Sequence, residues 1–196
     1  MISRDKAIIA DLMKFRVMSR DDICAIHFRG LKDPIKATNS VLKRLRRDGH
    51  VRAITDRHQY LYTHADQTLK KDSAKIPHFL AIVAVYREMC EVEKPKVFEV
   101  EPKVGEKGTV EPDVFAIWRK APFYIEVQRN IYSAKVFKAK LDRYEAFYYG
   151  EEWAKLSWQP RGKKPIFPRI WVIGEGNYDL QGRPFSVLHT QRARIN

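Results

Sequence analysis

Residues 113 to 128 constrain the fold most strongly, because they predict two hairpin strands with acidic side chains at their outer ends. Val114 to Trp118 and Phe123 to Gln128 are apolar runs of strand length, separated by Arg119 to Pro122. A four-residue turn there places Asp113 opposite Gln128, with Glu126 diagonal to Asp113 on the same face. Side chains in these positions lie about 5 to 8 Å apart. Two carboxylates at that separation can share one hard divalent cation.

The carboxylate pair has two interpretations. An ion held between Asp113 and Glu126 could activate water against a phosphodiester. Acidic residues are also common at strand ends, where they are simply solvated. The rest of the chain decides between these interpretations.

The overall charge narrows the class of partner. The chain has 196 residues, is 44% apolar and carries a net charge of +13, with a pI of about 9.8. Its length suits one domain or two small ones, and its charge favours a polyanion, with nucleic acid preferred over an anionic membrane surface. No apolar run approaches the roughly 18 residues of a spanning helix, and no signal-peptide pattern opens the sequence. We expect a cytoplasmic protein that binds nucleic acid.

The cysteines and histidines indicate neither a disulfide framework nor structural zinc. Cys24 and Cys90 fall on apolar positions of predicted helices, where a buried reduced thiol is the usual occupant. The six histidines lack the spacing of zinc ligands.

Residues 1 to 65 predict three helices followed by a hairpin. Ser3 is a candidate cap for the first helix and Ser19 for a short second one. The third helix is the best delimited, with Asp33 as N-cap, Pro34 at the first helical position and Gly49 as a left-handed stop. The first helix has an apolar stripe of Ile8, Ile9, Leu12 and Met13.

The third helix has one apolar and one basic side. Apolar or small residues recur at steps of three and four at Ile35, Thr38, Leu42 and Leu45. Val51 to Thr55 and Tyr60 to Thr63 then form a hairpin with a polar tip. Three helices and such a hairpin resemble a winged helix-turn-helix, in which the third helix enters the major groove and the wing touches the backbone.

This interpretation predicts a set of contacts to double-stranded DNA. A solvated helix face is the alternative, since exposed faces are usually charged. The charge distribution favours DNA, because residues 1 to 75 carry a net +8 and residues 76 to 196 a net +5. The predicted contacts are Lys36, Asn39, Ser40, Lys43, Arg47 and, at the wing tip, Arg57.

A polar, aperiodic segment at residues 66 to 76 predicts a linker to a second domain at 77 to 196. A helix is expected from Pro77 to about Glu91, nearly apolar all round. Strands are expected at 97–100, 113–118, 123–128, 170–173 and 185–189, with a long helix at about 132–153 before the fourth strand. Residues 158–168 form a basic, proline-rich loop. The whole chain is therefore predicted to be mixed α+β.

The order helix, three strands, helix, strand, with Pro112-Asp113 and Glu126-Val127-Gln128 on neighbouring strands, resembles the PD-(D/E)XK nuclease-like superfamily. The winged helix and the segments 124–129 and 140–148 make the chain similar to the plasmid replication-relaxation family. The resemblance covers most of the chain, although each motif is short.

The resemblance implies a magnesium site and a set of catalytic positions. Asp113 and Glu126 would be the metal ligands, with Glu88 as a candidate third acid or else a solvated charge. Gln128 stands where the superfamily most often has lysine, and a neutral amide supplies no positive charge. Lys140 lies at the edge of the apolar stripe of the long helix, where it either turns toward the strands or extends into water.

Three functions follow from these patterns. The first is a DNA-binding protein of a plasmid or other mobile element, controlling replication or copy number, or acting as a non-catalytic transcriptional regulator. The second is a magnesium-dependent endonuclease or nickase that uses Asp113, Glu126, Gln128 and Lys140. The third, a basic adaptor for an acidic protein, explains neither the amino-terminal pattern nor the hairpin. A homodimer on a palindromic site is compatible with the first.

Overall fold

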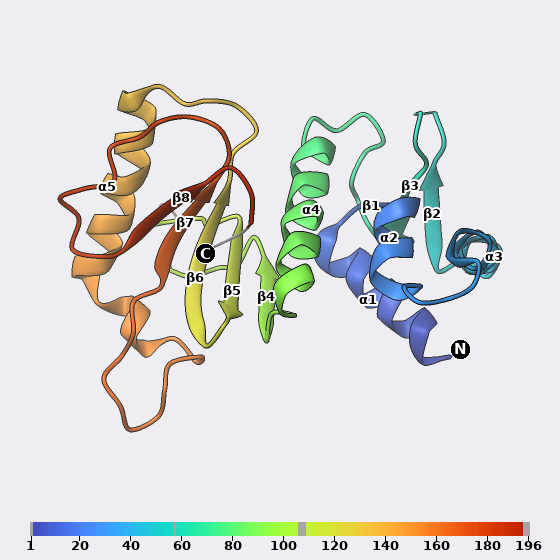
Figure 1. Cartoon of the computed structure of the whole chain (residues 1–196), viewed down its shortest axis with the longest axis horizontal. Coiled ribbons are helices and arrows are strands. Elements are labelled where there is room, and N and C mark those ends of the chain that lie inside the picture. The colour runs from blue at the N-terminus through green and yellow to red at the C-terminus, as the bar shows by residue number, and fades with distance from the viewer. Residues whose placement is uncertain (1, 57, 106–108, 194–196) are drawn as a thin grey trace. The chain divides into compact units, whose positions relative to one another are not determined.

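The chain divides into two compact units, each containing helices and a sheet. The computed structural model describes residues 2–56, 58–105 and 109–193 (Figure 1). Unit 1 comprises Met1–Arg87 and unit 2 comprises Glu88–Asn196. The described residues form five α-helices and two sheets, which confirms the mixed α+β class. None of these helices has the length and apolar content needed to cross a membrane.

The division between the units differs from the predicted linker at 66–76. It falls inside helix α4, which spans Ile76–Val92. The part of α4 up to Arg87 belongs to unit 1, and its side chains contact the rest of that unit. The ring of Tyr86 lies 5.2 Å from that of Phe15, and Arg87 donates to Asp22 at 2.9 Å.

Unit 1 consists of three helices and a small sheet. Its elements are α1 (Ser3–Phe15), β1 (Met18–Ser19), α2 (Arg20–His27), α3 (Pro34–Arg47), β2 (Val51–Ile54) and β3 (Leu61–His64). The strands are antiparallel in the order β1-β3-β2. The three predicted helices and the hairpin are present, whereas β1 is a two-residue strand that the sequence pattern did not indicate.

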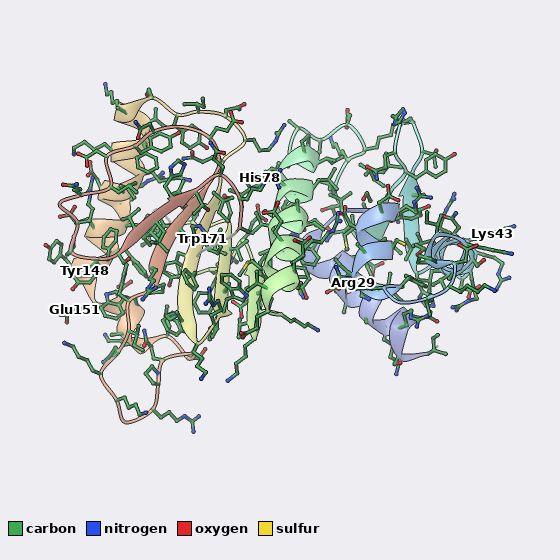
Figure 2. The ribbon with its side chains drawn as sticks, viewed as in Figure 1. Arg29, Lys43, His78, Tyr148, Glu151 and Trp171 are labelled. Carbon is green, nitrogen blue, oxygen red and sulfur yellow. The ribbon has the colours of Figure 1, made fainter. Side chains whose placement is uncertain are left out.

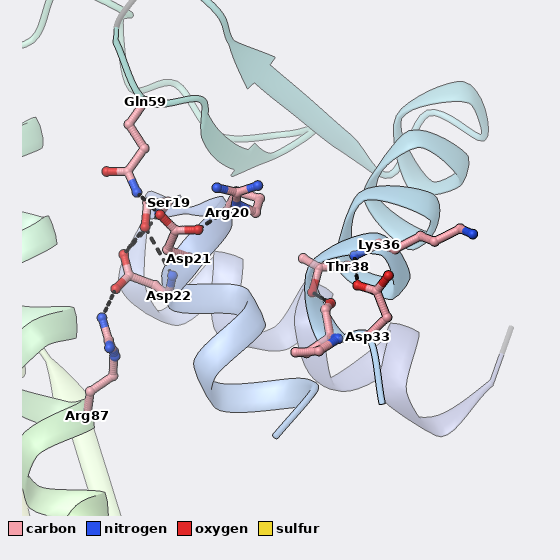
Figure 3. A network of polar contacts seen from close by, with 10 residues as sticks. Ser19, Arg20, Asp21, Asp22, Asp33, Lys36, Thr38, Gln59 and Arg87 are labelled. Carbon is pink, nitrogen blue, oxygen red and sulfur yellow. Dashed lines mark hydrogen bonds and ion pairs between the residues drawn. The ribbon is translucent and has the colours of Figure 1, made fainter. Parts of the chain in front are cut away.

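Side-chain capping explains where two of these helices begin. Ser19 accepts from the Asp22 backbone N–H at 3.0 Å while Asp22 accepts from the Ser19 backbone N–H at 3.1 Å, a reciprocal capping box (Figure 3). Asp33 caps α3 by accepting from the Lys36 N–H at 2.9 Å. Gly49, at φ 77°, follows the end of α3 as expected. The expected Ser3 cap is wrong, since Ile2 occupies the N-cap position and no side chain bonds there.

The apolar stripes of unit 1 are only partly as predicted. Ile8, Leu12, Thr38, Leu42 and Leu45 are buried. By contrast, Met13 of α1 and Ile35 of α3 are exposed, because both lie off the faces that meet the other helices. The thiols of Cys24 and Cys90 are only partly buried, which corrects the expectation of buried thiols.

A partly buried ion pair attaches α3 to α1. Both Asp5 carboxylate oxygens accept from the Arg44 guanidinium, each at 2.9 Å, and Asp5 is completely buried. The hydrogen bonds from Arg44 hold the pKa of Asp5 below its usual value. Arg44 therefore has a structural role, unlike the exposed cations on the other side of α3.

Unit 2 is built on a five-stranded mixed sheet in the order β4-β5-β6-β7-β8. Strands β4 (Val97–Val100), β5 (Val114–Trp118) and β6 (Ala121–Val127) are antiparallel. Helix α5 (Ala134–Gly150) and the 3₁₀ turn η1 (Glu152–Lys155) precede β7 (Arg169–Ile173), which is parallel to β6 and β8 (Val187–Thr190). The predicted long helix ends early because Glu151 adopts a left-handed conformation.

The predicted register of the β5–β6 hairpin is wrong by two residues. Val114 pairs with Ile125 and Trp118 with Ala121, so only Arg119 and Lys120 form the turn. Both have positive φ, at 48° and 64°, as a two-residue type I′ turn requires. Neither residue is the Asn or Gly typical of this turn, and the expected turn had four residues, Arg119 to Pro122. In the observed register Asp113 lies opposite Glu126.

Alternation along the strands builds an apolar layer on each face of this sheet. Helix α5 covers one face, where its buried residues meet Phe115, Tyr124 and Ile170 (Figure 1). On the opposite face the Trp118 and Trp171 rings stack at 5.7 Å, and Figure 2 marks Trp171 on its strand. Residues of β5 and β6 that point toward α5 are therefore surrounded by protein. Asp113 and Glu126 share that face.

Asp5→Asn should destabilise unit 1, because Arg44 would lose its bidentate carboxylate partner. The lowered pKa of Asp5 contributes stability above the pKa of the unfolded chain, and that contribution is lost as pH falls through the folded-state value. The variant should melt several degrees below the parent at pH 7, with the difference disappearing in acid. Calorimetry across pH measures this, and Asp48→Asn, at an exposed pair, is the control. A difference independent of pH would contradict the assignment.

Candidate functional site

A cleft of about 800 Å³ separates the exposed side of α3 from the β2–β3 loop in unit 1. Its walls come from the start of α2, the middle of α3 and the second half of the loop. The lining residues are Arg20, Asp21, Asn39, Lys43, Arg46, His58, Gln59, Tyr60 and Tyr62. The cleft thus combines cations, amides and aromatic rings on three different elements.

The electrostatics of this cleft favour an anion. Arg20 pairs with Asp21 at 2.5 Å, and Asp21 also accepts from Gln59 at 2.7 Å, which fixes one side of the loop (Figure 3). Among the described residues, Lys43 and Arg46 have no ion-pair partner. Burial raises the pKa of Tyr62, and Arg46 and Arg20 only partly oppose that rise. The Tyr62 hydroxyl therefore stays protonated at neutral pH and can donate.

The predicted DNA contacts divide between the cleft and the surface beside it. Asn39 and Lys43 line the cleft, and Lys43 projects outward from α3 (Figure 2). Lys36 and Ser40 are exposed outside it, and the Lys36 side chain points away from its cap residue Asp33 (Figure 3). Arg47 is exposed and pairs with Asp48 at 3.0 Å. Arg57 lies outside the described residues.

A second cluster surrounds the carboxylates of unit 2. Asp113 Oδ2 accepts from the Val127 backbone N–H at 2.7 Å, which holds this carboxylate at the end of β6. Glu126, only 2% exposed, receives the Lys140 ammonium at Oε2 and the Tyr144 hydroxyl at Oε1, the latter at 2.6 Å. Lys140 thus turns toward the strands rather than into water. The cluster joins β5, β6 and α5.

Burial and the neighbouring charges shift the pKa values in this cluster. Burial raises the pKa of Glu126, Lys140 lowers it and Asp113 raises it again, with a net rise. Burial alone would lower the pKa of Lys140, but the Glu126 carboxylate outweighs it and the pKa is raised. Lys140 therefore stays charged at neutral pH. The repulsion from Asp113 indicates that the two carboxylates are close enough to interact.

Gln128 is buried, 7% exposed, and its amide oxygen and nitrogen have no hydrogen-bond partner among the described residues. Its backbone N–H donates to the Ile173 carbonyl at 2.8 Å, which extends the pairing of β6 with β7. Gly174 packs so closely that a Cβ there would lie 2.7 Å from the Gln128 Cβ. A pocket of about 540 Å³ opens beside it, although the amide atoms are enclosed by protein.

Glu88 does not join the other two acids. Its Oε2 accepts from the Ala193 backbone N–H at 2.7 Å, so it anchors the end of unit 2. No group of three or more His, Cys, Asp or Glu side chains in the described ranges could hold a metal ion. Glu88, the candidate third acid, is therefore engaged elsewhere in the structure, and Asp113 and Glu126 remain as the two candidate ligands. Magnesium often uses one or two carboxylates together with substrate phosphates, and of this pair Glu126 is buried with both oxygens already accepting from Lys140 and Tyr144.

Sequence reasoning missed several members of both sites. Arg46 lies in α3 but was not among the predicted contacts, and Arg20 follows a helix cap that gave no functional signal. Tyr60 borders the predicted wing tip, which could have suggested it. Tyr144 was not among the predicted site residues, although it lies one turn after Lys140 on the same helix face.

The geometry defines a mixed α+β protein with a basic cleft in one unit and a buried carboxylate–lysine cluster in the other. A comparison of the chain with protein-family models, curated proteins and solved structures found no match to any of them.

Lys140→Met should lower the free energy of unfolding by about 3 kcal/mol at neutral pH, because Glu126 would remain buried without its cation. The folded-state pKa of Glu126, already raised, would rise further. Because the unfolded chain loses that proton at lower pH than the folded chain, the variant should lose stability as pH rises. Denaturant unfolding at about pH 5 and pH 8 measures this.

The double variant Glu126→Gln/Lys140→Met is the matched control, since it removes both charges. It should recover part of the lost stability and remove the additional pH dependence. Equal deficits of Lys140→Met at both pH values would show that the pair is not electrostatically coupled.

Proposed function

We propose that the protein binds double-stranded DNA through unit 1, as a winged helix-turn-helix. The observation that carries this proposal is the cleft between α3 and the β2–β3 loop, where Lys43 and Arg46 have no acidic partner among the described residues. In this arrangement α3 would enter the major groove and the loop would contact the adjacent backbone. Asn39 has the amide that pairs bidentately with adenine, and the cations suit phosphate or guanine.

The contacts that hold α3 against the rest of unit 1 favour its role in DNA binding. Leu42 and Leu45 are buried and Arg44 bonds to Asp5, so three residues fix the rotation of the helix. A helix held in this way presents Asn39 and Lys43 on a rigid surface, and little ordering is needed on binding.

We further infer that unit 2 is a PD-(D/E)XK nuclease-like domain and that the chain resembles the plasmid replication-relaxation family. The order of three antiparallel strands, helix α5 and the parallel strand β7, and the proximity of Asp113 to Glu126, support this. Such a protein would act in the cytoplasm, in replication or copy-number control of a plasmid or mobile element. A non-catalytic transcriptional regulator, including a homodimer on a palindromic site, would use the same DNA contacts.

A magnesium-dependent endonuclease or nickase is the second candidate, favoured by the position of Lys140. Magnesium bound by Asp113 and Glu126 would polarise a phosphodiester. Lys140 places beside Glu126 the positive charge that Gln128 cannot supply, where it would stabilise negative charge developing on phosphate. The Val127 N–H holds Asp113 in orientation.

Lys43→Ala combined with Arg46→Ala should weaken duplex binding and make its salt dependence shallower by about 2 in the slope of log K against log salt. Two counterion-releasing contacts would be lost. Fluorescence anisotropy titrations over a series of salt concentrations measure the slope.

Lys6→Ala combined with Arg29→Ala removes the same charge from exposed positions of unit 1 outside the cleft. This control should keep most of the parent slope. If both double variants lose binding equally, the cleft has no special role. If the parent binds no duplex, the proposed function is wrong.

Asp113→Asn should reduce magnesium-dependent nicking of supercoiled DNA by roughly 100-fold if the second candidate is correct, because one anionic ligand becomes neutral while its shape is retained. Agarose-gel assays with and without magnesium measure this. Glu99→Gln, at an exposed carboxylate of β4, should leave nicking unchanged. A parent that binds DNA but shows no nicking would exclude the enzyme and leave the DNA-binding proposal intact.

A further inference from the structure

The segment between Glu152 and Glu175 in unit 2 contains no acidic residue. It carries five cations, Lys155, Arg161, Lys163, Lys164 and Arg169. Residues 88–196 as a whole hold 19 Lys plus Arg and 15 Asp plus Glu, a net charge of +4. The excess positive charge of unit 2 is therefore concentrated in this single segment, which projects from the sheet between η1 and β7 (Figure 1).

The side chain of Gln159 closes this segment into a loop. Its Oε1 accepts from the Ile166 N–H at 2.9 Å, and its Nε2 donates to the Ile166 carbonyl at 3.0 Å. The same Nε2 donates to the Trp153 carbonyl at 3.1 Å. One amide thus joins both ends of residues 159–166 in the way that a pair of backbone hydrogen bonds joins two strands.

Aromatic contacts anchor the loop on both sides of this closure. The Trp158 ring lies 4.9 Å from Phe115 of the sheet, and the Phe167 ring lies 5.0 Å from Tyr148 and 5.1 Å from Trp153. The base of the loop is consequently part of the unit 2 core. The residues between the anchors are held at a defined place rather than on a free chain.

The tip of the loop carries three exposed cations in four residues, Arg161, Lys163 and Lys164 around Gly162. Gly162 has φ 69°, which allows the turn, and Pro160 and Pro165 restrict the backbone on either side. None of the three cations forms an ion pair within the described part of the chain. A partner would therefore meet unpaired charge on a preformed support.

We propose that this loop is a second DNA contact, which grips the phosphate backbone without reading sequence. The inference rests on the DNA-binding function proposed above and adds a site in the other unit. Backbone phosphates are the partner that fits, because three exposed cations lie within four residues and have no ion-pair partner in the described part of the chain. A protein partner would need apolar contact area at the centre of the interface, and residues 161–164 contain no apolar side chain.

The test compares salt dependence between the parent and the triple variant Arg161→Ala/Lys163→Ala/Lys164→Ala on a long mixed-sequence duplex. Losing three phosphate contacts should make the slope of log K against log salt shallower by about 2 to 3. The matched control is Lys94→Ala/Lys96→Ala/Lys103→Ala, three exposed lysines of unit 2 outside the loop. It should keep the parent slope, and thermal melting should confirm that both variants fold.

Lysine acetylation of the parent, read by mass spectrometry, gives an independent measurement. Bound duplex should protect Lys163 and Lys164 but leave Lys94 and Lys96 reactive. A parent that binds DNA while the loop variant keeps its full slope and the loop lysines stay reactive would overturn this inference alone, and would leave an acidic protein as the loop's partner. A parent that binds no duplex would overturn the proposed function together with this inference.

Discussion

Burying a carboxylate costs several kcal/mol unless a cation and hydrogen-bond donors meet it, and in unit 2 that requirement falls on Glu126. Lys140 and Tyr144, one turn apart on α5, meet its two oxygens. The same helix face carries Phe137 and Leu141 into the core. The polar contacts thus fix the rotation of α5 while the apolar contacts fix its distance from the sheet, and the position of Asp113 beside Glu126 depends on both.

Unit 1 also contains a buried carboxylate that needs a cation. Asp5 is buried and accepts two hydrogen bonds from Arg44, so one side of α3 packs against α1. Lys43 and Arg46, on its other side, have no acidic partner in the described structure, and they line the cleft with Arg20. In both units, the carboxylates that are paired inside the protein hold a helix in place. The exposed cations that have no acidic partner in the described structure are the ones we propose to bind DNA.

Local signals in the sequence predicted local structure well. The predicted start and end of α3 were correct because Asp33, Pro34 and Gly49 determine only the conformation of the adjacent helical turn. The hairpin register failed because Arg119 and Lys120 adopt conformations that their residue types do not favour, and tertiary pairing imposes them. The position of Glu88 could not be predicted for another reason. Whether Glu88 meets Ala193 or the other acids depends on packing that no spacing rule encodes.

The length of the two-residue turn at Arg119 and Lys120 sets which residues of β5 and β6 face each other, and so it places Asp113 opposite Glu126. Strand side chains alternate between faces, so a single insertion in that turn would move one strand's residues to the opposite side of the sheet. Either the paired acids or the stacked tryptophans would then be displaced. Homologous chains should therefore vary freely in the length of the loop closed by Gln159, yet keep this turn constant or change it only in steps of two.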